Sequence, residues 1–441
     1  MGSHLGYPMD RTPLGGGAMV GLNLARVWAA DSSLRLAALG SGPQAPFADT
    51  ATARYVRLAG VDEGLVELSE LAYARFCRRF EGETTEWLLS RRDEWKPEET
   101  AVVVNDISEG PDLERIKGAG YRVVSIWHVD VVDYFCKLYL RNILRPERLT
   151  ALYESLHRRK LSDIVPDVLR LVFSKQRETV AHSDVMVLPS RAMIEPVERC
   201  YGSTIGSGRP VTPRCLVQPW GALGAWRAAD PAKTAELRTR YGIGPDTDVI
   251  LTLSRISPEK GIHLLVEALE RLERDGRIKR DTALIICGEA AFMMGQTYLR
   301  KVQRAAARLK RVRVVFPGYL SAEQKPEHFA LAHLFVSPSV HESYGLNVVE
   351  ALRAGLPVLA SDHYGVKDIL KDEYGVRVSY EEPGGAPAAL AEQVEILLND
   401  KPRLKAMGVA AAVAATEMTF ERAAANILSA AFKRLPNGAA A

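Results

Sequence analysis

The sequence predicts an α/β protein made of two Rossmann-like doubly wound parallel-sheet domains that face each other across a cleft, with a C-terminal helix crossing between them. Three observations predict this fold. The second half alternates short apolar, β-branched runs with longer amphipathic stretches, and the first half repeats that rhythm less regularly. A stretch rich in Gly, Pro and Ser separates the halves. Repeated strand and helix units of this kind form parallel sheets covered by helices on both faces.

The second half has the clearer pattern. We expect strands at 249–253, 283–287, 312–316, 334–336 and 357–360, and a further short one at 375–379. The stretches between them carry apolar residues at helical spacing. We therefore expect helices near 262–275, 297–309, 323–332 and 345–354.

The first half gives strand candidates at 34–39, 101–105, 122–126 and 184–188, and a helical insert between roughly 60 and 97. The Gly- and Pro-rich stretch then sets the domain boundary. We predict an N-terminal domain over 1–208, a linker or hinge over 209–225 and a C-terminal domain over 226–415. A final helix over 416–441 is expected to pack back toward the N-terminal domain.

The overall composition excludes several classes of protein. The 441 residues are 47% hydrophobic and 25% charged, with a formal net charge of +3, which is too balanced for nucleic acid to be the main partner. The five cysteines are scattered without a C-x-x-C pair, so we expect neither a disulfide framework nor a zinc site. With no apolar run long enough to span a membrane, we expect a cytoplasmic protein.

The loop after the strand at 249–253 contains two cations. Its sequence, SRISPEKG, places Arg255 and Lys260 on either side of a turn at Pro258. Ligands of doubly wound sheets bind outside the carboxyl ends of the strands. A guanidinium and an ammonium at such a place suit a diphosphate, which Arg grips with two hydrogen bonds and Lys attracts as a point charge.

The loop after the strand at 334–336 reads SPSVHESYGLNVVE and opens a helix. The backbone amides of Gly345, Leu346 and Asn347 would lie at the helix N-terminus, which attracts phosphate. Glu342 precedes this cradle and Glu350 follows it, so that one carboxylate could accept hydroxyl groups on each side of a diphosphate. This pattern is typical of a site for a nucleotide sugar. Gly288, after the strand at 283–287, would let a ligand approach the backbone.

Two features of the first half point to the same kind of ligand. Gly15, Gly16 and Gly17 directly precede an amphipathic helix, although they do not form the G-x-G-x-x-G pattern of a dinucleotide site. His128 follows the strand at 122–126 and would point into the cleft from the other wall.

Each of these features also has a purely structural interpretation. Glu350 could pair with Arg353 on the helix surface, His128 could be a core histidine, and the three glycines could be a flexible turn. A basic group, Arg158, Arg159, Lys160, Lys175 and Arg177, could meet a membrane surface or an anionic acceptor, but acids are interspersed and we favour a solvated helical face. The coincidence of ligand-binding groups in four strand-end loops favours the functional interpretation.

The chain closely resembles the retaining GT-B glycosyltransferases of family 4, also called group 1. Their pattern of two glutamates separated by seven residues is similar to PSVHESYGLNVVEALRAGLPVLAS, and their Arg and Glu-Lys-Gly signature to SRISPEKGIHLLVEAL. AHSDVMVLPS (181–190) is similar to the last strand of the family's first domain, and FERAA (420–424) to its terminal helix. The resemblance is specific over about 180–435.

The resemblance implies roles for residues already singled out. Arg255 and Lys260 would bind the donor diphosphate and stabilise the leaving group, Glu350 would hold the ribose and Glu342 the donor sugar. His128 is similar to the family's acceptor-side histidine, and Gly16 and Gly17 to its glycine-rich loop. The implied catalytic residues are His128, Arg255, Lys260 and Glu342. The implied donor-binding residues are Gly16, Gly17, Arg255, Lys260, Gly288, Glu342, Ser343, Tyr344, Gly345, Leu346, Asn347 and Glu350.

We therefore expect a retaining, metal-independent transferase that moves a sugar from UDP or GDP to a small-molecule or lipid-linked acceptor by front-face attack, without a cofactor. Asp130 and Asp133 beside His128 lack the D-x-D spacing of a metal site. A nucleotide-sugar epimerase or phosphorylase of the same fold, and a catalytically silent nucleotide-binding subunit, stay open as alternatives. Partners would be the donor and the acceptor, with no nucleic acid and no membrane span, and with peripheral membrane contact as a less favoured possibility.

Overall fold

The structure is a computed structural model, in which the chain consists of two compact units. Unit 1 comprises Met1–Trp220 and Phe420–Ala441, and unit 2 comprises Gly221–Thr419. The residues described are all except 8–14, 61–64, 66–67, 131, 134–135, 137–143, 162–166, 203–209, 224–226, 291–294, 382 and 433–441. The last nine residues of the predicted C-terminal helix and both ends of the predicted linker therefore lie outside the described residues.

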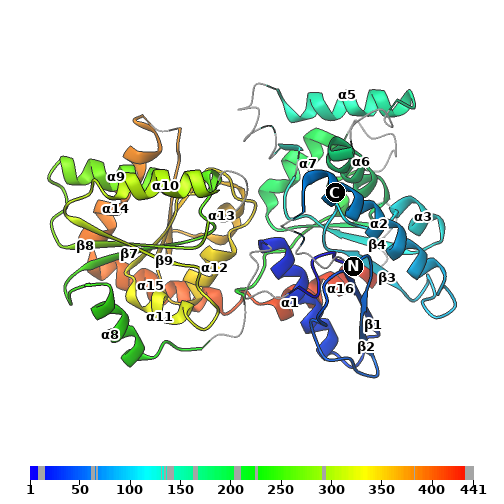
Figure 1. The fold of residues 1–441 in the computed structure, drawn as a ribbon, viewed down its shortest axis with the longest axis horizontal. Helices are drawn as coiled ribbons and strands as arrows, with labels where there is room; N and C mark the ends of the chain where they lie inside the picture. The colour runs from blue at the N-terminus through cyan, green and yellow to red at the C-terminus, as the bar shows by residue number, and fades with distance from the viewer. Residues whose placement is uncertain are drawn as a thin grey trace. The chain divides into compact units, whose positions relative to one another are not determined.

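Unit 2 contains one six-stranded parallel sheet in the order β12-β11-β10-β7-β8-β9. Figure 1 labels three of its strands, β7, β8 and β9. Its strands are β7 (Asp248–Leu253), β8 (Thr282–Cys287), β9 (Val312–Gly318), β10 (Leu334–Ser337), β11 (Val358–Ser361) and β12 (Gly375–Val378). All of them overlap strands predicted from sequence. The central strand β8 is buried along its whole length, as its continuous apolar run requires.

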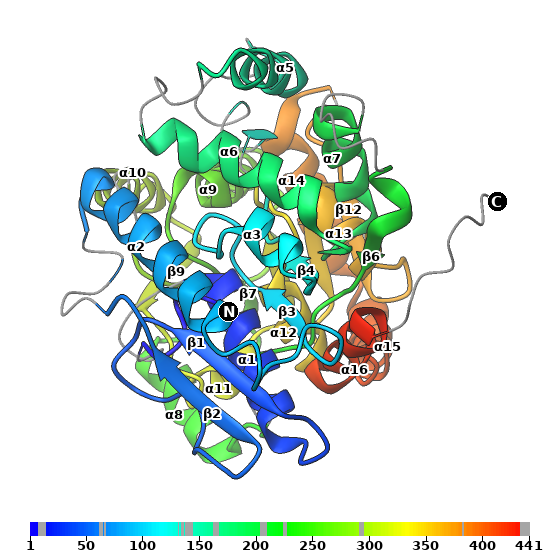
Figure 2. The same ribbon diagram turned by 90° about the vertical axis from the view of Figure 1, so that its right-hand side faces the viewer.

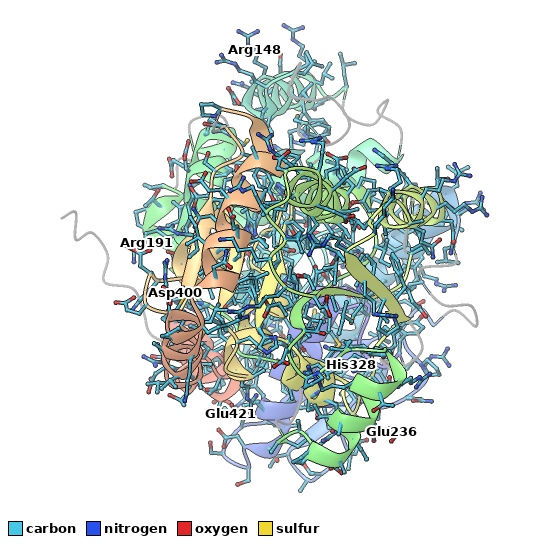
Figure 3. All side chains as sticks on the ribbon, turned by 90° about the vertical axis from the view of Figure 1, so that its left-hand side faces the viewer. Arg148, Arg191, Glu236, His328, Asp400 and Glu421 are labelled. Atoms are coloured by element: carbon cyan, nitrogen blue, oxygen red, sulfur yellow. The ribbon has the colours of Figure 1, made fainter. Side chains whose placement is uncertain are left out.

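Helices connect the strands of unit 2. They are α8 (Pro231–Arg240), α9 (Ile262–Arg274), α10 (Gly295–Ala306), α11 (Lys325–Leu331), α12 (Leu346–Arg353), α13 (Tyr364–Ile369), α14 (Gly385–Asn399) and α15 (Lys401–Ala415). In α9, Leu265, Leu269 and Leu272 recur at helical spacing and are buried against the sheet. His328 of α11 lies toward α8 (Figure 3), where its Nε2 is 2.9 Å from the hydroxyl of Tyr241.

Unit 1 contains two parallel sheets. One pairs β1 (Leu36–Gly40) with β2 (Ala53–Arg57), and the other has the order β3 (Ala101–Val104), β4 (Arg122–Ile126), β5 (Val185–Leu188) and β6 (Cys215–Val217). The first residues of the chain lie between the two sheets, because Gly2 N donates to Leu39 O at 3.0 Å and Asn105 N donates to Met1 O at 2.9 Å. The predicted fold class, an α/β protein with two Rossmann-like domains, is confirmed.

Two strands of unit 1 differ from the sequence prediction. β2, with the sequence ARYVR, was not predicted, because flanking arginines interrupt its apolar character. β6 lies within the stretch predicted as linker, where its three residues pair in register with β5. The neighbouring prolines and glycines concealed so short an edge strand.

The helices of unit 1 cover these sheets (Figure 2). They are α1 (Gly16–Ala30), α2 (Glu70–Leu89), α3 (Leu113–Gly118), α5 (Pro146–Arg158), α6 (Asp167–His182), α7 (Ile194–Tyr201) and α16 (Phe420–Phe432). The C-terminal helix α16 packs on this unit: the indole of Trp28 donates to Ala424 O at 3.3 Å, and Arg122 donates to Ala430 O at 3.1 Å.

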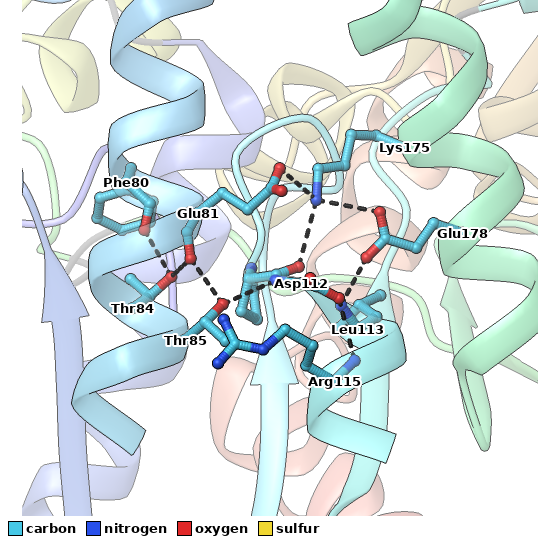
Figure 4. A network of polar contacts seen from close by, with 10 residues as sticks. Phe80, Glu81, Thr84, Thr85, Asp112, Leu113, Arg115, Lys175 and Glu178 are labelled. Carbon is cyan, nitrogen blue, oxygen red and sulfur yellow. Dashed lines mark hydrogen bonds and ion pairs between the residues drawn. The ribbon is translucent and has the colours of Figure 1, made fainter. Parts of the chain in front are cut away.

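A buried lysine holds three helices of unit 1 together (Figure 4). Lys175 of α6 is 6% exposed, and its Nζ lies 2.7 Å from Glu81 Oε2 of α2 and 3.1 Å from Glu178 Oε2. Glu178 accepts in turn from the amide of Leu113, the first residue of α3. The predicted solvated face was therefore wrong at Lys175, since two carboxylates neutralise this cation inside the unit.

The other cations of this basic group differ in exposure. Arg177 of α6 is also ion-paired, with Nε 2.6 Å from Glu154 Oε2 of α5. Arg158, Arg159 and Lys160 at the end of α5 are exposed, as the prediction of a solvated face required.

Candidate active site

The topology of the unit 2 sheet defines where a ligand can bind. β7 and β10 are neighbours, but the chain runs from β7 through β8 to β9 on one side and from β10 through β11 to β12 on the other. The loops after β7 and β10 therefore lead away in opposite directions. This divergence is the topological switch point, where open α/β sheets bind their ligands. Two of the loops singled out from sequence, those after β7 and β10, flank this point.

The backbone joins these two loops directly. Val340 N, after β10, donates to Glu259 O, after β7, at 2.8 Å. Gly261 ends the short 3-10 helix Pro258–Lys260 with φ 62°, and a Cβ at this position would lie 1.9 Å from Pro338 O. Only glycine permits both the left-handed backbone and the close approach. Lys260 and Glu342 are thereby brought to one place.

Lys260 and Glu342 form an ion pair. The ammonium of Lys260 contacts Glu342 Oε2, and the two side chains are 11% and 18% exposed. Burial disfavours the carboxylate of Glu342, but the charges of Lys260, His363 and Arg255 outweigh it, so that the pKa of Glu342 is lowered. Because Lys260 uses Oε2, the second oxygen of Glu342 can accept a hydrogen bond from a hydroxyl group.

Arg255 is held more loosely beside this pair. Its Nη2 lies 3.9 Å from Glu259 Oε1, and its side chain is 29% exposed. Glu259 is itself fixed by a hydrogen bond of 2.6 Å from the Ser257 hydroxyl. A guanidinium that is partly exposed at this place can donate hydrogen bonds to a bound anion.

The N-terminus of α12 provides the third group. Gly345 caps the helix with φ 106°, and Asn347 ties the first turn to the sheet, because its Nδ2 donates to Leu253 O of β7 at 2.9 Å. The Asn347 Oδ1 accepts from Val348 N at 3.0 Å. The amides of Gly345 and Leu346 are the first of the helix, at the positive end of its dipole.

The remaining predicted residues of this loop take different positions. Tyr344 is buried at 4% exposure, whereas Ser343 is only partly buried. The backbone of Tyr344 is packed so tightly that a Cβ on Gly365 would lie 1.9 Å from Tyr344 O. Ser343 is therefore the residue of the pair whose side chain can change without disturbing the backbone.

Glu350 lies on the buried side of α12. It is 6% exposed, and its Oε1 accepts from Nζ of Lys325, on α11, at 2.6 Å. The alternative partner considered from sequence was Arg353, whereas the structure pairs Glu350 with Lys325. The ion pair orients the carboxylate and engages one of its oxygens.

Gly288 is required by the sheet itself. It has φ 135°, and a Cβ at this position would lie 1.8 Å from Ser254 O. Its amide donates to Gly318 O at 2.8 Å. These contacts hold the ends of three neighbouring strands together, and they explain the glycine without a ligand.

Sequence reasoning missed His363, which follows β11. This histidine is 9% exposed, and neither ring nitrogen makes a hydrogen bond of normal geometry within the described part of the chain. Burial lowers the pKa of His363 to about 4, against the opposing attraction of Glu342. A lone histidine carries no recognisable spacing, so its proximity to Glu342 and Lys260 could be found only from the fold.

In unit 1 the structure brings together Gly17, Asn105 and His128. A Cβ on Gly17 would lie 2.7 Å from His128 Cδ2, and His128 Nε2 lies 3.2 Å from Asn105 Oδ1. Gly16 lies beside Gly17 in the first turn of α1 and is exposed. Burial lowers the pKa of His128, so this imidazole is neutral at neutral pH. Asn105 was not singled out from the sequence.

Asp130 and Asp133 serve the local backbone. Asp130 Oδ1 accepts from the amides of Val132 and Asp133, both at 3.0 Å, and Asp133 pairs with Arg199 at 3.3 Å. Among the described residues, no group of three or more His, Cys, Asp or Glu side chains could hold a metal ion. None of the described helices is long and apolar enough to cross a membrane.

The two parallel-sheet units have the GT-B fold, which solved glycosyltransferase structures share. The chain matches the structure of Anabaena Alr3699/HepE in complex with UDP and glucose with a TM-score of 0.60 and 18% identity, covering 95% of this chain and 96% of that one. It matches WaaG, a glycosyltransferase involved in lipopolysaccharide biosynthesis, with a TM-score of 0.63 and 17% identity, covering 97% and 98%. At these identities the likeness shows the fold.

The sequence identifies the family more narrowly. Residues 233–413 match the family described as glycosyl transferases group 1. The predicted resemblance to this family is thereby confirmed over residues 233–413, which lie within unit 2.

Curated relatives match part of the chain. A GDP-mannose-dependent alpha-(1-6)-phosphatidylinositol monomannoside mannosyltransferase from Mycolicibacterium smegmatis is 38% identical over 192 residues, which are 42% of this chain and 47% of the relative. The alpha-D-kanosaminyltransferase of Streptomyces kanamyceticus is 34% identical over 174 residues, 40% and 42% of the two chains. The chain spans about half the length of the curated relatives it matches.

Proposed function

We propose that this chain is a retaining glycosyltransferase of the cytoplasm that transfers a sugar from a UDP or GDP sugar to a small-molecule or lipid-linked acceptor. One observation carries the proposal: Arg255, Lys260, Glu342 and the N-terminus of α12 gather at the switch point of the unit 2 sheet. The names of the relatives, which include GDP-mannose-dependent enzymes, support a nucleotide sugar as donor.

The diphosphate would occupy the positive side of this site. The amides of Gly345 and Leu346 would bind the distal phosphate, while Arg255 and Lys260 stabilise the negative charge that develops on the leaving group. The protein would then require no metal for this step. Glu342 would accept a hydroxyl of the donor sugar and Glu350 the ribose hydroxyls, since both carboxylates are already oriented by a lysine.

Retention of configuration follows from a front-face reaction. The acceptor oxygen would form its bond to the anomeric carbon on the face from which the diphosphate leaves. Its proton would pass to the departing phosphate oxygen, so that no protein nucleophile is needed. His128 of unit 1 would hold a substrate hydroxyl from the acceptor side.

Donor binding provides the first test. Folded protein is stabilised by any ligand that does not bind the unfolded chain, so UDP, GDP, ADP and dTDP can be ranked by their effect on the melting temperature. Calorimetry then compares wild type with Lys260→Met and Glu350→Gln, for which we expect nucleotide affinity to fall about tenfold or more, equivalent to about 1.4 kcal/mol. The exposed Lys233 of α8 gives the control variant Lys233→Met. Unchanged affinity in both site variants would remove the donor from the switch point.

The reaction itself provides the second test. GDP-mannose and UDP-glucose, each with and without candidate acceptors, are incubated in the presence and absence of EDTA. We expect nucleotide release in both conditions and a product whose anomeric configuration, read by NMR, equals that of the donor. An inverted product would refute retention, and loss of activity in EDTA would refute metal independence. An epimerised sugar, or intact donor with every acceptor, would refute glycosyl transfer.

A further inference from the structure

Asn105, the residue after β3, contacts three polar groups of unit 1. Its Nδ2 lies 3.1 Å from Gly17 O and 3.2 Å from Asp106 Oδ2. Its Oδ1 lies 3.2 Å from His128 Nε2. The side chain therefore connects helix α1, the end of β3 and the residue that follows β4.

Gly17 O and Asp106 Oδ2 determine the orientation of the Asn105 side-chain amide, that is, which end carries the NH2 group. A backbone carbonyl can only accept a hydrogen bond, and so can an ionised carboxylate. Asp106 is ionised: burial opposes its charge, but the contact with His4 at 3.2 Å lowers the pKa of Asp106 to about 2. Both groups thus require the NH2 end of Asn105, which leaves its oxygen for His128.

The oxygen of Asn105 in turn fixes the tautomer of His128. An amide oxygen accepts but cannot donate, so His128 must carry its proton on Nε2 and its lone pair on Nδ1. The position of the ring agrees with this assignment. The three ring atoms nearest to a Cβ built on Gly17 are Cδ2 at 2.7 Å, Cγ at 2.9 Å and Nε2 at 3.3 Å. The ring therefore presents its Cδ2 corner to α1, and Nδ1 lies on the opposite side of the ring.

The glycines of α1 leave room for this arrangement. Gly17 packs against the ring of His128 at its Cδ2 atom. Gly21, one helical turn further along α1, packs against the side-chain amide of Asn105. A Cβ on Gly21 would be 2.6 Å from Asn105 Cγ. Both members of the hydrogen-bonded pair are thus packed against glycines on one face of the helix, and any larger residue would push them apart.

We propose that Asn105 is a positioning residue that holds His128 as the Nε2–H tautomer and so presents Nδ1 as the acceptor for a hydroxyl group of the sugar substrate. This inference rests on the proposed function, in which His128 contacts substrate. Asn105 itself does not touch the reacting atoms. It acts by keeping the lone pair of His128 on the nitrogen that faces away from α1.

The charges around His128 keep it in the neutral form that this role needs. Burial lowers the pKa of His128, the carboxylate of Asp106 opposes that effect, and the charge of His4 adds to it. The net charge of the pair His4 and Asp106 is close to zero. Burial lowers the pKa of His4, but Asp106 outweighs burial and raises it to about 9, and Asp106 itself is ionised. Protonation of His128 would block Nδ1, so activity should fall on the acid side of a pH profile.

The tautomer can be measured without any assay of activity. In protein with nitrogen-15-labelled histidine, long-range proton–nitrogen NMR spectra assign the protonated nitrogen of each ring. We expect Nε2–H for His128 in wild type and a mixture of tautomers in Asn105→Ala. Asn23→Ala is the matched control, since Asn23 also bonds a backbone carbonyl of α1, Met19 O at 2.8 Å, without touching His128. An Nδ1–H tautomer in wild type would overturn the proposal.

Kinetics provide the second readout. In Asn105→Ala we expect kcat to fall about tenfold with the donor KM within about twofold. In Asn105→Asp the added carboxylate would raise the pKa of His128, so the acid limb of the pH profile should move to higher pH. A wild-type kcat and an unmoved acid limb in these two variants would overturn the proposal.

A folding defect and a failure of the proposed function remain distinguishable from a failure of this inference. If Asn105→Ala does not fold, Gly21→Ala displaces Asn105 without removing it, and we expect the same change of tautomer. If wild type shows the Nε2–H tautomer and Asn105→Ala loses it while no sugar is transferred, the positioning role is supported and the glycosyltransferase assignment is refuted.

Discussion

Gly17 and His128 occupy neighbouring positions that exclude any side chain between them: a Cβ on Gly17 would lie 2.7 Å from Cδ2 and 2.9 Å from Cγ of the imidazole. Contacts this short do not occur between real atoms, so the ring would have to move. The glycine of α1 and the histidine after β4 therefore depend on each other, although 111 positions separate them in the sequence.

The first prediction concerns this contact. Gly17→Ala should lower turnover about tenfold or more, because the displaced imidazole no longer meets its substrate hydroxyl. The control is Gly82→Ala in α2, where a Cβ would meet nothing within 4 Å and helix propensity favours alanine. Steady-state kinetics with circular dichroism provide the comparison. Equal turnover in Gly17→Ala and Gly82→Ala would show that the His128 ring can accommodate the added methyl group without losing its function.

The second prediction separates the roles of the two units. His128→Ala should lower kcat far more than it weakens nucleotide binding, since His128 lies in unit 1 and the residues proposed to bind the diphosphate lie in unit 2. Removal of one hydrogen-bonding group positioned at a reacting centre lowers rates by about 10²–10³-fold. Calorimetry with UDP and GDP gives the affinity, and initial rates give kcat. A variant with wild-type turnover would reduce His128 to a packing residue.

The third prediction tests the connection between the two loops of the switch point. Gly261→Ala should destabilise the protein by more than about 1 kcal/mol and weaken nucleotide binding, because its Cβ would meet Pro338 O. Gly276→Ala is a close control: its φ of 67° resembles the 62° of Gly261, but a Cβ there meets nothing within 4 Å. The difference between the two variants in melting temperature isolates the contact from the backbone strain. Identical losses would contradict the proposed connection.

The fourth prediction is a pH dependence of stability caused by His363. Its folded pKa of about 4 lies below the ordinary 6.5, so between these values the unfolded chain binds more protons. Stability from this residue is present above the unfolded pKa and is lost as the pH falls toward 4. The loss between about pH 7 and about pH 5 should be of the order of 2 kcal/mol.

A variant without the imidazole, His363→Phe, isolates this effect. The free energy of unfolding, measured by chemical denaturation, should decline less steeply with falling pH in the variant than in wild type. Parallel curves would show that His363 is accessible enough to protonate in the folded state. Because the free energy of unfolding is compared between wild type and His363→Phe at each pH, the contributions of the other titrating groups cancel to a first approximation.

The sequence was most informative for elements whose structure is determined by residues adjacent in the chain. In unit 2 most strands contain a run of apolar residues and the helices between them carry apolar residues at helical spacing, so β7 to β11 could be placed within about two residues. Unit 1 was harder because its short strands depend on their neighbours. β2 contains two arginines, and β6 consists of three residues that become a strand only beside β5.

The site residues also fall into two groups: those predictable from local sequence and those that depend on contacts made in the fold. Lys260 and Glu342 could be placed at strand ends from sequence, but their pairing needed the approach of Gly261 to Pro338. The partner of Glu350, Lys325, lies on another helix and has no fixed spacing from it. Asn105 and His363 are single polar residues without a recognisable motif. Their proximity to His128 and to Glu342 is known only from the folded structure.

The loop that carries Glu342 is confined at both ends by glycines, Gly261 against Pro338 O and Gly365 against Tyr344 O, each leaving less than 2 Å for a Cβ. A loop fixed in this way cannot be lengthened or re-routed without separating its neighbours. Any attempt to engineer a new donor preference should therefore randomise the side chain at Ser343, and leave the number of residues between β10 and α12 as it is.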